Sequence, residues 1–288
     1  MEADVHILYE SDYYEIIDFR CLCQSCAKTK NEYTEKFSIS FVRSGNFYYH
    51  TWNKTLDRFN GEILISKPDY EHAVTHVKDA WDHCTLLQFT DSFYASLQEK
   101  YSQVCSWFFQ RDVQSVLIHC KAEMQYLHDA ILEAFRDKTD FKLKIDDLVF
   151  ELVESIFNVF LTGECIDSGS DLKKVHLTTI EKAKDYISRN FHSDISLKEI
   201  ASSCYVSPFH FSRIFKSFTR YSPHQFLLLY RLKHAELLLR TTQLPVTDIC
   251  YLSGFNYVEH FDATFKKKYR TSPSSYQSLR QKKNSNIS

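Results

Sequence analysis

Five side chains in the N-terminal part of the chain have the chemistry of metal ligands. Cys21, Cys23 and Cys26 fall within six residues, and Cys84 follows a histidine on or just before a predicted strand. Thiolates bind soft cations, and three thiolates joined by a fourth cysteine or a histidine would complete a tetrahedral, zinc-like site. His76 is the candidate histidine. These residues predict a site for zinc or another thiophilic metal, or a redox-sensitive thiol cluster.

The same residues also allow an interpretation without a cofactor. A Cys-x-Cys-x-x-Cys run is less specific than two separated Cys-x-x-Cys pairs, and the chain has nine cysteines, an odd number. Its first ten residues lack the basic segment of a secretory signal, so we expect a cytoplasmic protein whose thiols stay reduced. His72 is then a packed or surface histidine. The metal, redox and incidental interpretations of the cysteines all stay open at this point.

A second set of residues has the chemistry of DNA recognition. Ser207 and Pro208 are the N-cap and first residue of a predicted helix. Helical spacing turns one stripe of that helix inward, made of Phe211, Ile214, Phe215 and Phe218. It turns Phe209, Ser212, Arg213 and Lys216 outward. An outward arginine could bind a guanine edge through two hydrogen bonds, worth about 1–3 kcal/mol of discrimination.

The charge distribution supports a polyanionic partner for this half of the chain. Residues 1–172 carry 16 basic and 29 acidic side chains, a charge of −13, whereas residues 173–288 carry 19 basic and 8 acidic ones, a charge of +11. The net charge of −2 conceals this asymmetry. Because no apolar run reaches about 18 residues, we expect no membrane partner.

The acidic half predicts a small antiparallel barrel followed by helices. Residues 38–89 contain short aromatic and β-branched runs separated by turn signals at roughly 8–12 residue spacing, as in small sandwiches and barrels. Apolar residues at three- and four-residue steps predict helices over 113–135 and 144–161. Residues 163–174 have the composition of an exposed linker, and they lie where the charge changes sign.

The basic half predicts helices throughout, arranged as a repeat. Ser196 and Glu199 form a capping box before a short helix, a turn at Tyr205 and a second helix. A long helix over 223–240 leads to a second copy, in which Ile249-Cys250 matches Ile200-Ala201 and Phe261 matches Phe211. Both copies have the order helix, turn, helix, so the second helix of each could enter a major groove.

Over residues 175–280 the sequence resembles the AraC/XylS family of transcription regulators. The matching segments are 195–201, 207–216, 246–250, Gly254-Phe255 and 265–267 followed by 272–276. The resemblance implies base contacts from Phe209, Ser212 and Arg213. Residues 1–165 resemble the cupin-type sensor and dimerisation domain of many members, on the basis of residues 61–65, Pro68 and His72.

The second recognition helix departs from the family pattern. Its expected DNA-facing residues are Tyr257, Val258, Glu259 and Asp262, of which two are acids that phosphates repel. We therefore expect weaker base recognition here, with Lys266 and Lys267 anchoring phosphates. Arg270-Thr271 replaces the glycine usual before the final Ser-Pro, which leaves the geometry of that turn open.

The sequence as a whole predicts an α+β protein. A cupin-like sensor and dimerisation barrel with two amphipathic helices occupies 1–165, a linker 166–174, an all-α tandem helix-turn-helix domain joined by a long helix 175–280, and a flexible basic tail 281–288. We expect a non-enzymatic transcription regulator that binds double-stranded DNA. Its expected partners are RNA polymerase, a second copy of the chain and a small-molecule, metal or redox signal. The alternative is a cupin-type metal-binding protein or enzyme with an accessory basic domain.

Overall fold

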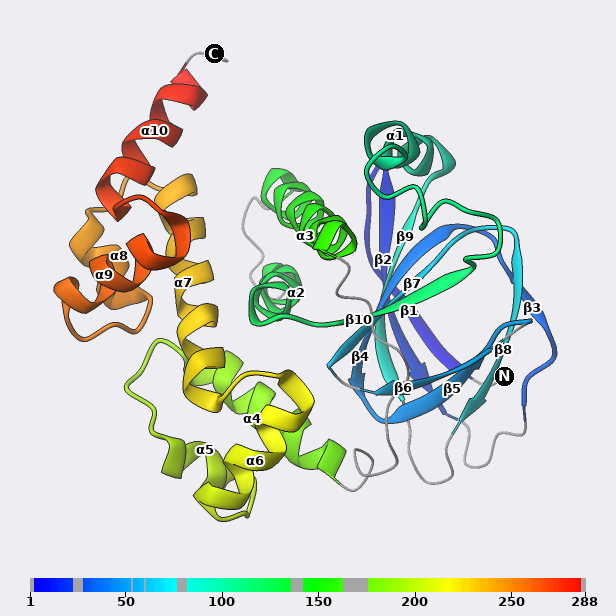
Figure 1. Cartoon of the computed structure of the whole chain (residues 1–288), viewed down its shortest axis with the longest axis horizontal. Helices are drawn as coiled ribbons and strands as arrows, with labels where there is room; N and C mark the ends of the chain where they lie inside the picture. Colours follow the sequence, from blue (N-terminus) through cyan, green and yellow to red (C-terminus); the bar gives the residue numbers. More distant parts are fainter. Residues whose placement is uncertain are drawn as a thin grey trace. The chain divides into compact units, whose positions relative to one another are not determined.

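The computed structural model describes residues 3–22, 28–52, 54–59, 61–76, 82–135, 142–162 and 176–285. The chain divides into two compact units (Figure 1). The first comprises Met1–Met124 and Ala130–Glu181, and the second comprises Gln125–Asp129 and Lys182–Ser288. The first unit contains the sheets and the second contains the helix-turn-helix repeat. The expected linker, 166–174, lies outside the described residues.

Two antiparallel sheets form the first unit. The larger has the order β1-β2-β9-β4-β7-β10, and the smaller has the order β3-β8-β5-β6. The larger sheet consists of β1 (Ala3–Glu10), β2 (Tyr14–Cys21), β4 (Phe37–Ser44), β7 (Glu62–Ser66), β9 (His83–Phe89) and β10 (Ser115–His119). The smaller consists of β3 (Glu32–Thr34), β5 (Asn46–His50), β6 (Thr55–Phe59) and β8 (Tyr70–His76).

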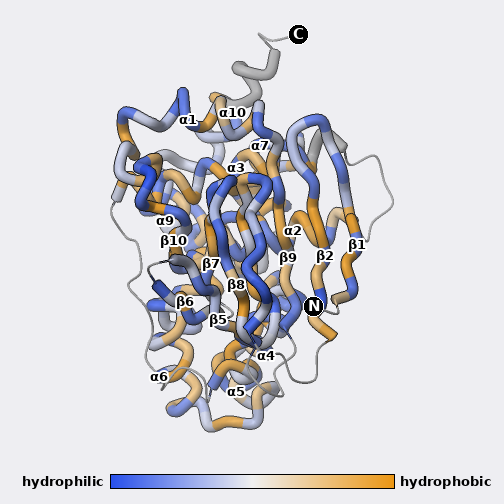
Figure 2. Tube along the Cα trace, turned by 90° about the vertical axis from the view of Figure 1, so that its right-hand side faces the viewer, coloured by the Kyte–Doolittle hydropathy of each residue, from blue (hydrophilic) through white to orange (hydrophobic). Residues whose placement is uncertain are grey.

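Strand β7 shows why the strand prediction over 38–89 succeeds. Its five residues are all buried, and its Ile-Leu-Ile run gives the strand a hydrophobic stretch (Figure 2). Ile63 pairs with Phe41 of β4 on one side and with Ile118 of β10 on the other. A strand that is buried on both faces and paired on both edges has a short continuous run of apolar residues in its sequence, not an alternating pattern.

Two features of the predicted sensor domain differ from the structure. Residues 113–135 are not one helix, because Ser115–His119 form β10 and only Ala122–Ala134 form helix α2. The apolar run Val116-Leu117-Ile118 has helical spacing to its neighbours, but pairing with β7 buries it at the sheet edge. The barrel prediction is also not confirmed, since neither sheet closes on itself in the described part of the chain.

The other predicted helix of this part is confirmed. Helix α3 spans Lys142–Thr162, and helix α1 spans Asp91–Tyr101 after an N-cap at Thr90. The Tyr14 hydroxyl on β2 donates to Asp146 Oδ1 on α3 at 2.5 Å. Burial of Tyr14, followed by the bond to Asp146, raises the pKa of this phenol far above its ordinary value. The bond therefore ties α3 to the larger sheet.

The second unit is helical, as predicted. Its helices are α4 (Leu177–Asn190), which enters this unit at Lys182, α5 (Leu197–Ser203), α6 (Pro208–Thr219), α7 (Pro223–Thr241), α8 (Val246–Leu252), α9 (Val258–Tyr269) and α10 (Pro273–Ser285). The capping box of Ser196 and Glu199 is present in both directions. Helix α10 extends through residues expected as part of a tail. In the described part of the chain, no helix is long and apolar enough to cross a membrane.

The two copies of the repeat end in the same backbone conformation. Helix α6 ends at Arg220 with φ 63°, and helix α9 ends at Arg270 with φ 62°, both in the left-handed region. The amide of each donates to the carbonyl four residues earlier, that of Lys216 or Lys266. The turn before Pro273 thus keeps its geometry without a glycine.

Candidate functional site

Helix α6, predicted to be the first recognition helix, is fixed by an N-cap and a buried stripe. The Ser207 hydroxyl accepts a hydrogen bond from the His210 amide at 3.3 Å, and Pro208 occupies the first helical position. All four residues of the predicted inward stripe are buried, namely Phe211, Ile214, Phe215 and Phe218. The inner face of α6 is therefore fixed by packing, and the opposite face is left to solvent.

The outward face of α6 carries the residues predicted to contact DNA. Ser207, Pro208, Arg213 and Lys216 are exposed, and Ser212 is half-buried. Phe209 is also outward, with 76% of its surface exposed. An aromatic ring held in water could bury apolar surface against a thymine methyl group.

Helix α9, predicted to be the second recognition helix, differs from α6 in its N-cap and in the charge of its exposed face. Its N-cap, Tyr257, makes no side-chain capping bond and is 70% exposed. Phe261 and Phe265 are buried inward in the core cluster of this half. Glu259 and Asp262 are exposed, Val258 is half-buried, and the exposed Lys266, Lys267 and Lys268 lie in the last turn. The acids thus lie at the helix start and the lysines at its end.

Helix α7 joins the two copies of the repeat. Its 19 residues extend for about 28 Å at the rise of an α-helix. Buried side chains of α7 enter both cores, with Phe226 against Phe215 of α6, and Leu239 in the cluster around Phe261.

An arginine in the middle of α7 joins the end of α4 to the second turn. Arg231 Nε donates to the Phe191 carbonyl, and its Nη2 donates to the Ser193 carbonyl, both at 2.7 Å. Gly254 of the second turn lies against the same group at φ +80°. Burial lowers the pKa of the Arg231 guanidinium from its ordinary value. The end of α4, the middle of α7 and the turn of the second copy therefore meet at one point.

Of the five residues predicted as metal ligands, the structure brings two together, Cys21 and His76. Cys21 lies within 4.8 Å of His76 and Asp82, measured between possible ligand atoms, and all three residues are buried. Cys84 instead packs in an apolar cluster with residues such as Val42 and Leu64. Cys23 and Cys26 lie outside the described residues. Within the described parts no cysteines are joined by disulfides.

Asp82 is the member of this group that sequence reasoning missed. The signal available was its position six residues after His76 and two before Cys84, at the start of a strand. Cys84 is the more distinctive candidate in this segment, because a thiolate is a stronger indication of a soft-metal site than a carboxylate. His72 is not in the group; its ring stacks on Tyr49 with centroids 4.9 Å apart, and its Nδ1 lies 3.2 Å from the Thr34 hydroxyl.

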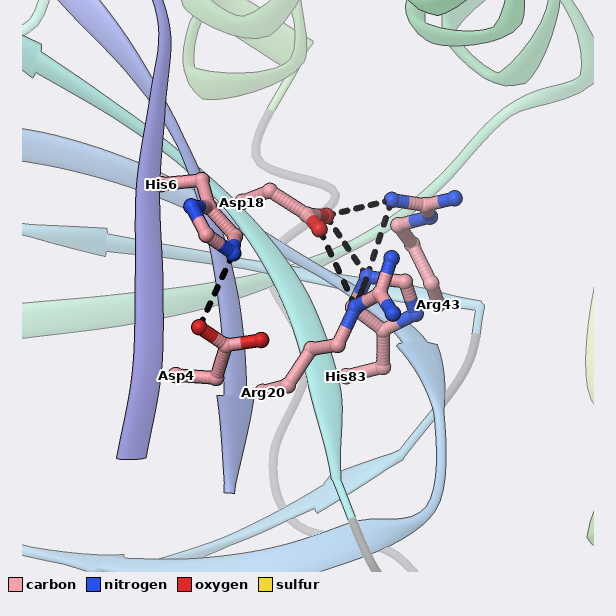
Figure 3. A network of polar contacts seen from close by, with 6 residues as sticks. All are labelled: Asp4, His6, Asp18, Arg20, Arg43 and His83. Carbon is pink, nitrogen blue, oxygen red and sulfur yellow. Dashed lines mark hydrogen bonds and ion pairs between the residues drawn. The ribbon is translucent and has the colours of Figure 1, made fainter. Parts of the chain in front are cut away.

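A polar network occupies neighbouring strands of the larger sheet (Figure 3). Asp18 Oδ1 accepts from Arg43 Nη1 at 2.7 Å and lies 2.6 Å from His83 Nε2, while its Oδ2 accepts from Arg20 Nε at 3.1 Å. Burial would raise the pKa of Asp18, but the His83 hydrogen bond and the two arginines outweigh it and lower this pKa. The network is satisfied internally and holds three strands together.

Comparison with known proteins supports the interpretation of the second unit. Residues 200–278 match a family described as "Helix-turn-helix domain". The probable transcriptional regulator LumQ of Photobacterium leiognathi is 32% identical over 143 residues, which are 48% of this chain and 56% of LumQ. The chain thus spans about half the length of that relative, and it spans 33% of the regulatory protein PocR of Salmonella typhimurium, which is 29% identical over 101 residues.

A solved structure is similar over about a third of the chain. The C-terminal domain of AraT, a response regulator from Geobacillus stearothermophilus, is 31% identical, with a TM-score of 0.35 over 35% of this chain and 85% of that one. The second unit is a tandem helix-turn-helix domain. It is of the AraC type, and the resemblance predicted from the sequence is confirmed for this domain. The cupin resemblance of the first unit stays a prediction.

Proposed function

We propose that this chain is a sequence-specific, DNA-binding transcription regulator in which α6 reads bases and α9 mainly anchors the backbone. The observation that carries the proposal is the exposed face of α6, where Phe209, Arg213 and Lys216 stand outward from a helix fixed by its buried phenylalanines. The curated relatives LumQ and PocR are described as regulators, which agrees with this proposal.

Charge distinguishes the roles of the two recognition helices. Arg213 can donate two hydrogen bonds to the O6 and N7 atoms of a guanine. Glu259 and Asp262 are repelled by phosphates and accept hydrogen bonds only from donors such as cytosine N4. The three lysines that end α9 are positioned to neutralise phosphates, which strengthens binding without sequence preference.

The test uses the full chain and a duplex selected from random double-stranded DNA. Binding is measured by fluorescence anisotropy against the selected duplex and against a scrambled one, at several salt concentrations. We expect log Kd to depend linearly on log salt, and each of Lys266→Ala and Lys267→Ala to reduce that slope by about 1. Arg213→Ala should lose about 1–3 kcal/mol of discrimination at particular base pairs and leave binding to the scrambled duplex nearly unchanged.

Substitutions in α9 provide the contrast. Glu259→Gln and Asp262→Asn should tighten binding to both duplexes, because each removes a charge that phosphates repel. Arg189→Ala is the matched control, since Arg189 is an exposed arginine on α4 that pairs with Asp185 at 2.7 Å. Binding that is absent, or that is independent of salt, would refute the proposal. Equal loss on both duplexes for Arg213→Ala would refute base recognition by α6.

The first unit would then supply the signal. We propose that it responds to a small-molecule, metal or redox signal and pairs with a second copy of the chain, and that bound DNA brings the regulator to RNA polymerase. Sedimentation of the full chain with and without DNA tests the dimer. A monomer at concentrations that saturate the selected duplex would exclude it.

A further inference from the structure

Three chemically different ligands converge at one end of the first unit. Cys21 is the last residue of β2, His76 is the last residue of β8, and Asp82 directly precedes β9. Each has at most 7% of its surface exposed. Their candidate ligand atoms all lie within 4.8 Å of one another. A thiol, an imidazole and a carboxyl group are thus enclosed together at strand ends.

The backbone fixes two of these groups relative to each other. The Cys21 amide donates to the Asp82 carbonyl at 3.0 Å, which extends the pairing of β2 with β9 to the residues that carry the ligands. The third group is held by its side chain, since His76 Nδ1 lies 2.5 Å from Asp82 Oδ1. The arrangement is therefore part of the fold. A carboxylate oxygen of Asp82 and a ring nitrogen of His76 both lie within 4.8 Å of Cys21 Sγ.

The donor set selects a class of metal. Thiolate, imidazole and carboxylate are the three ligand types that Zn²⁺ takes, at about 2.3, 2.0 and 2.1 Å. These bond lengths place tetrahedral ligand atoms roughly 3.2–3.8 Å apart. His76 Nδ1 and Asp82 Oδ1, now 2.5 Å apart, would have to separate by about 1 Å. Cys21 Sγ lies no more than 4.8 Å from a ligand atom of each residue, so it would have to approach by about 1 Å at most, a movement that a strand end can make. Hard cations such as Mg²⁺ prefer all-oxygen sites and do not fit.

We propose that Cys21, His76 and Asp82 form a mononuclear binding site for Zn²⁺ or a metal of the same class. The ion displaces the proton between His76 and Asp82, and this proton and that of the Cys21 thiol are both released to solvent. Because β2 and β9 belong to one sheet and β8 to the other, the bound ion links the two sheets. Three protein ligands leave one tetrahedral position for water or another donor.

The test is a titration of reduced, metal-free full-length protein with Co²⁺, which replaces Zn²⁺ and reports thiolate coordination by a near-ultraviolet charge-transfer band. One equivalent should bind, and one equivalent of Zn²⁺ should abolish the band. Cys21→Ser should remove the band, and Cys21→Ser, His76→Gln and Asp82→Asn should each weaken binding on the order of 100-fold. Cys84→Ser is the matched control, because Cys84 and Cys21 are equally buried, with 2% of each exposed.

Circular dichroism would show which variants fold, and Cys21→Ser is the decisive one since it changes a single atom. A wild-type chain that binds no metal, a band that survives Cys21→Ser in folded protein, or an equal loss in Cys84→Ser would each overturn the proposal. Zn²⁺ should also raise the melting temperature of the wild type and leave that of Cys21→Ser unchanged. DNA binding by the metal-free protein is a separate measurement, so either proposal can fail without the other.

Discussion

Arg231 Nε donates a hydrogen bond to the carbonyl oxygen of Phe191, forty residues earlier in the sequence, at 2.7 Å. This bond joins the centre of the connecting helix to the chain just after α4. Gly254, from the turn of the second copy, lies so close that an added Cβ would be 2.3 Å from the Phe191 oxygen. The position of the second copy against α7 and the end of α4 therefore depends on a residue without a side chain.

Gly254→Ala should destabilise the second unit by about 2–4 kcal/mol, since it combines a backbone clash with a left-handed conformation that alanine adopts at a cost. Chemical unfolding of the full chain, followed by circular dichroism, measures this. A loss of unfolding free energy below about 0.5 kcal/mol, the size typical of a surface substitution, would show that the backbone at Phe191 moves to accommodate the added methyl group.

The equivalent position of the first turn gives a matched contrast. Tyr205 has φ 60° and is 87% exposed, with Lys182 Nζ 5.3 Å from its ring centroid. Tyr205→Gly removes a left-handed penalty of about 1–2 kcal/mol and adds backbone entropy to the unfolded chain worth about 0.5–1 kcal/mol. We expect stability unchanged or slightly increased. A clear loss would mean that the tyrosine ring stabilises the turn through Lys182.

A buried ion pair makes the second unit sensitive to acid. Glu236 Oε2 lies 2.9 Å from Lys233 Nζ, and the Tyr276 hydroxyl of α10 donates to its other oxygen. Burial would raise the pKa of Glu236, but the charge of Lys233, the Tyr276 hydrogen bond and the charge of Arg240 lower it below its ordinary value of 4.5. The folded state therefore holds this carboxylate ionised where the unfolded state would protonate it.

Such a group contributes stability above its unfolded pKa, and the contribution is lost as pH falls through the folded value. Glu236→Gln should cost about 3–5 kcal/mol at pH 7, because it leaves the Lys233 charge buried without its carboxylate. The difference from wild type should narrow as the pH falls below 4.5. A constant difference across that range in urea unfolding curves would contradict the assigned direction.

Arg220 and Arg270 end α6 and α9 in the left-handed conformation, which costs stability, and each adds a positive charge there. Arg270→Gly should stabilise the second unit by about 0.5–1 kcal/mol, because glycine adopts the left-handed conformation freely. It should also weaken DNA binding by removing a positive charge beside the lysines of α9. Arg220→Gly is the parallel variant at the end of α6. If Arg220→Gly and Arg270→Gly were both less stable than the wild type, the arginine side chains would have to make stabilising contacts in the folded protein.

Tyr14 tests the attachment of α3 to the larger sheet. Tyr14→Phe removes the hydroxyl that donates to Asp146 and leaves that carboxylate without this partner, at a cost of about 1–3 kcal/mol. Hydrogen exchange should increase in α3 more than in β7. Equal protection of α3 in both proteins would show that its apolar residues alone attach it.

The sequence was informative where one element buries one face by itself. The stripe of Phe211, Ile214, Phe215 and Phe218 predicted the orientation of α6, and the caps predicted where it begins. It was less informative for residues 115–119, because Val116-Leu117-Ile118 has apolar spacing compatible with both helix and strand, and only pairing with β7 decides. Asp82 was missed for a related reason: its ligand partners come from other strands, and no local pattern marks them.

The two copies of the repeat also differ in length by one residue. Ala201 and Cys250 are 49 residues apart, and the amides of Val206 and Phe255 return to them in the same way, whereas Phe211 and Phe261 are 50 apart. The second turn is therefore one residue longer, and the extra residue precedes α9. A chimera that exchanges α6 and α9 to change specificity should therefore have its junctions inside the helices. A transplant aligned on the turns would rotate every outward side chain by about 100°.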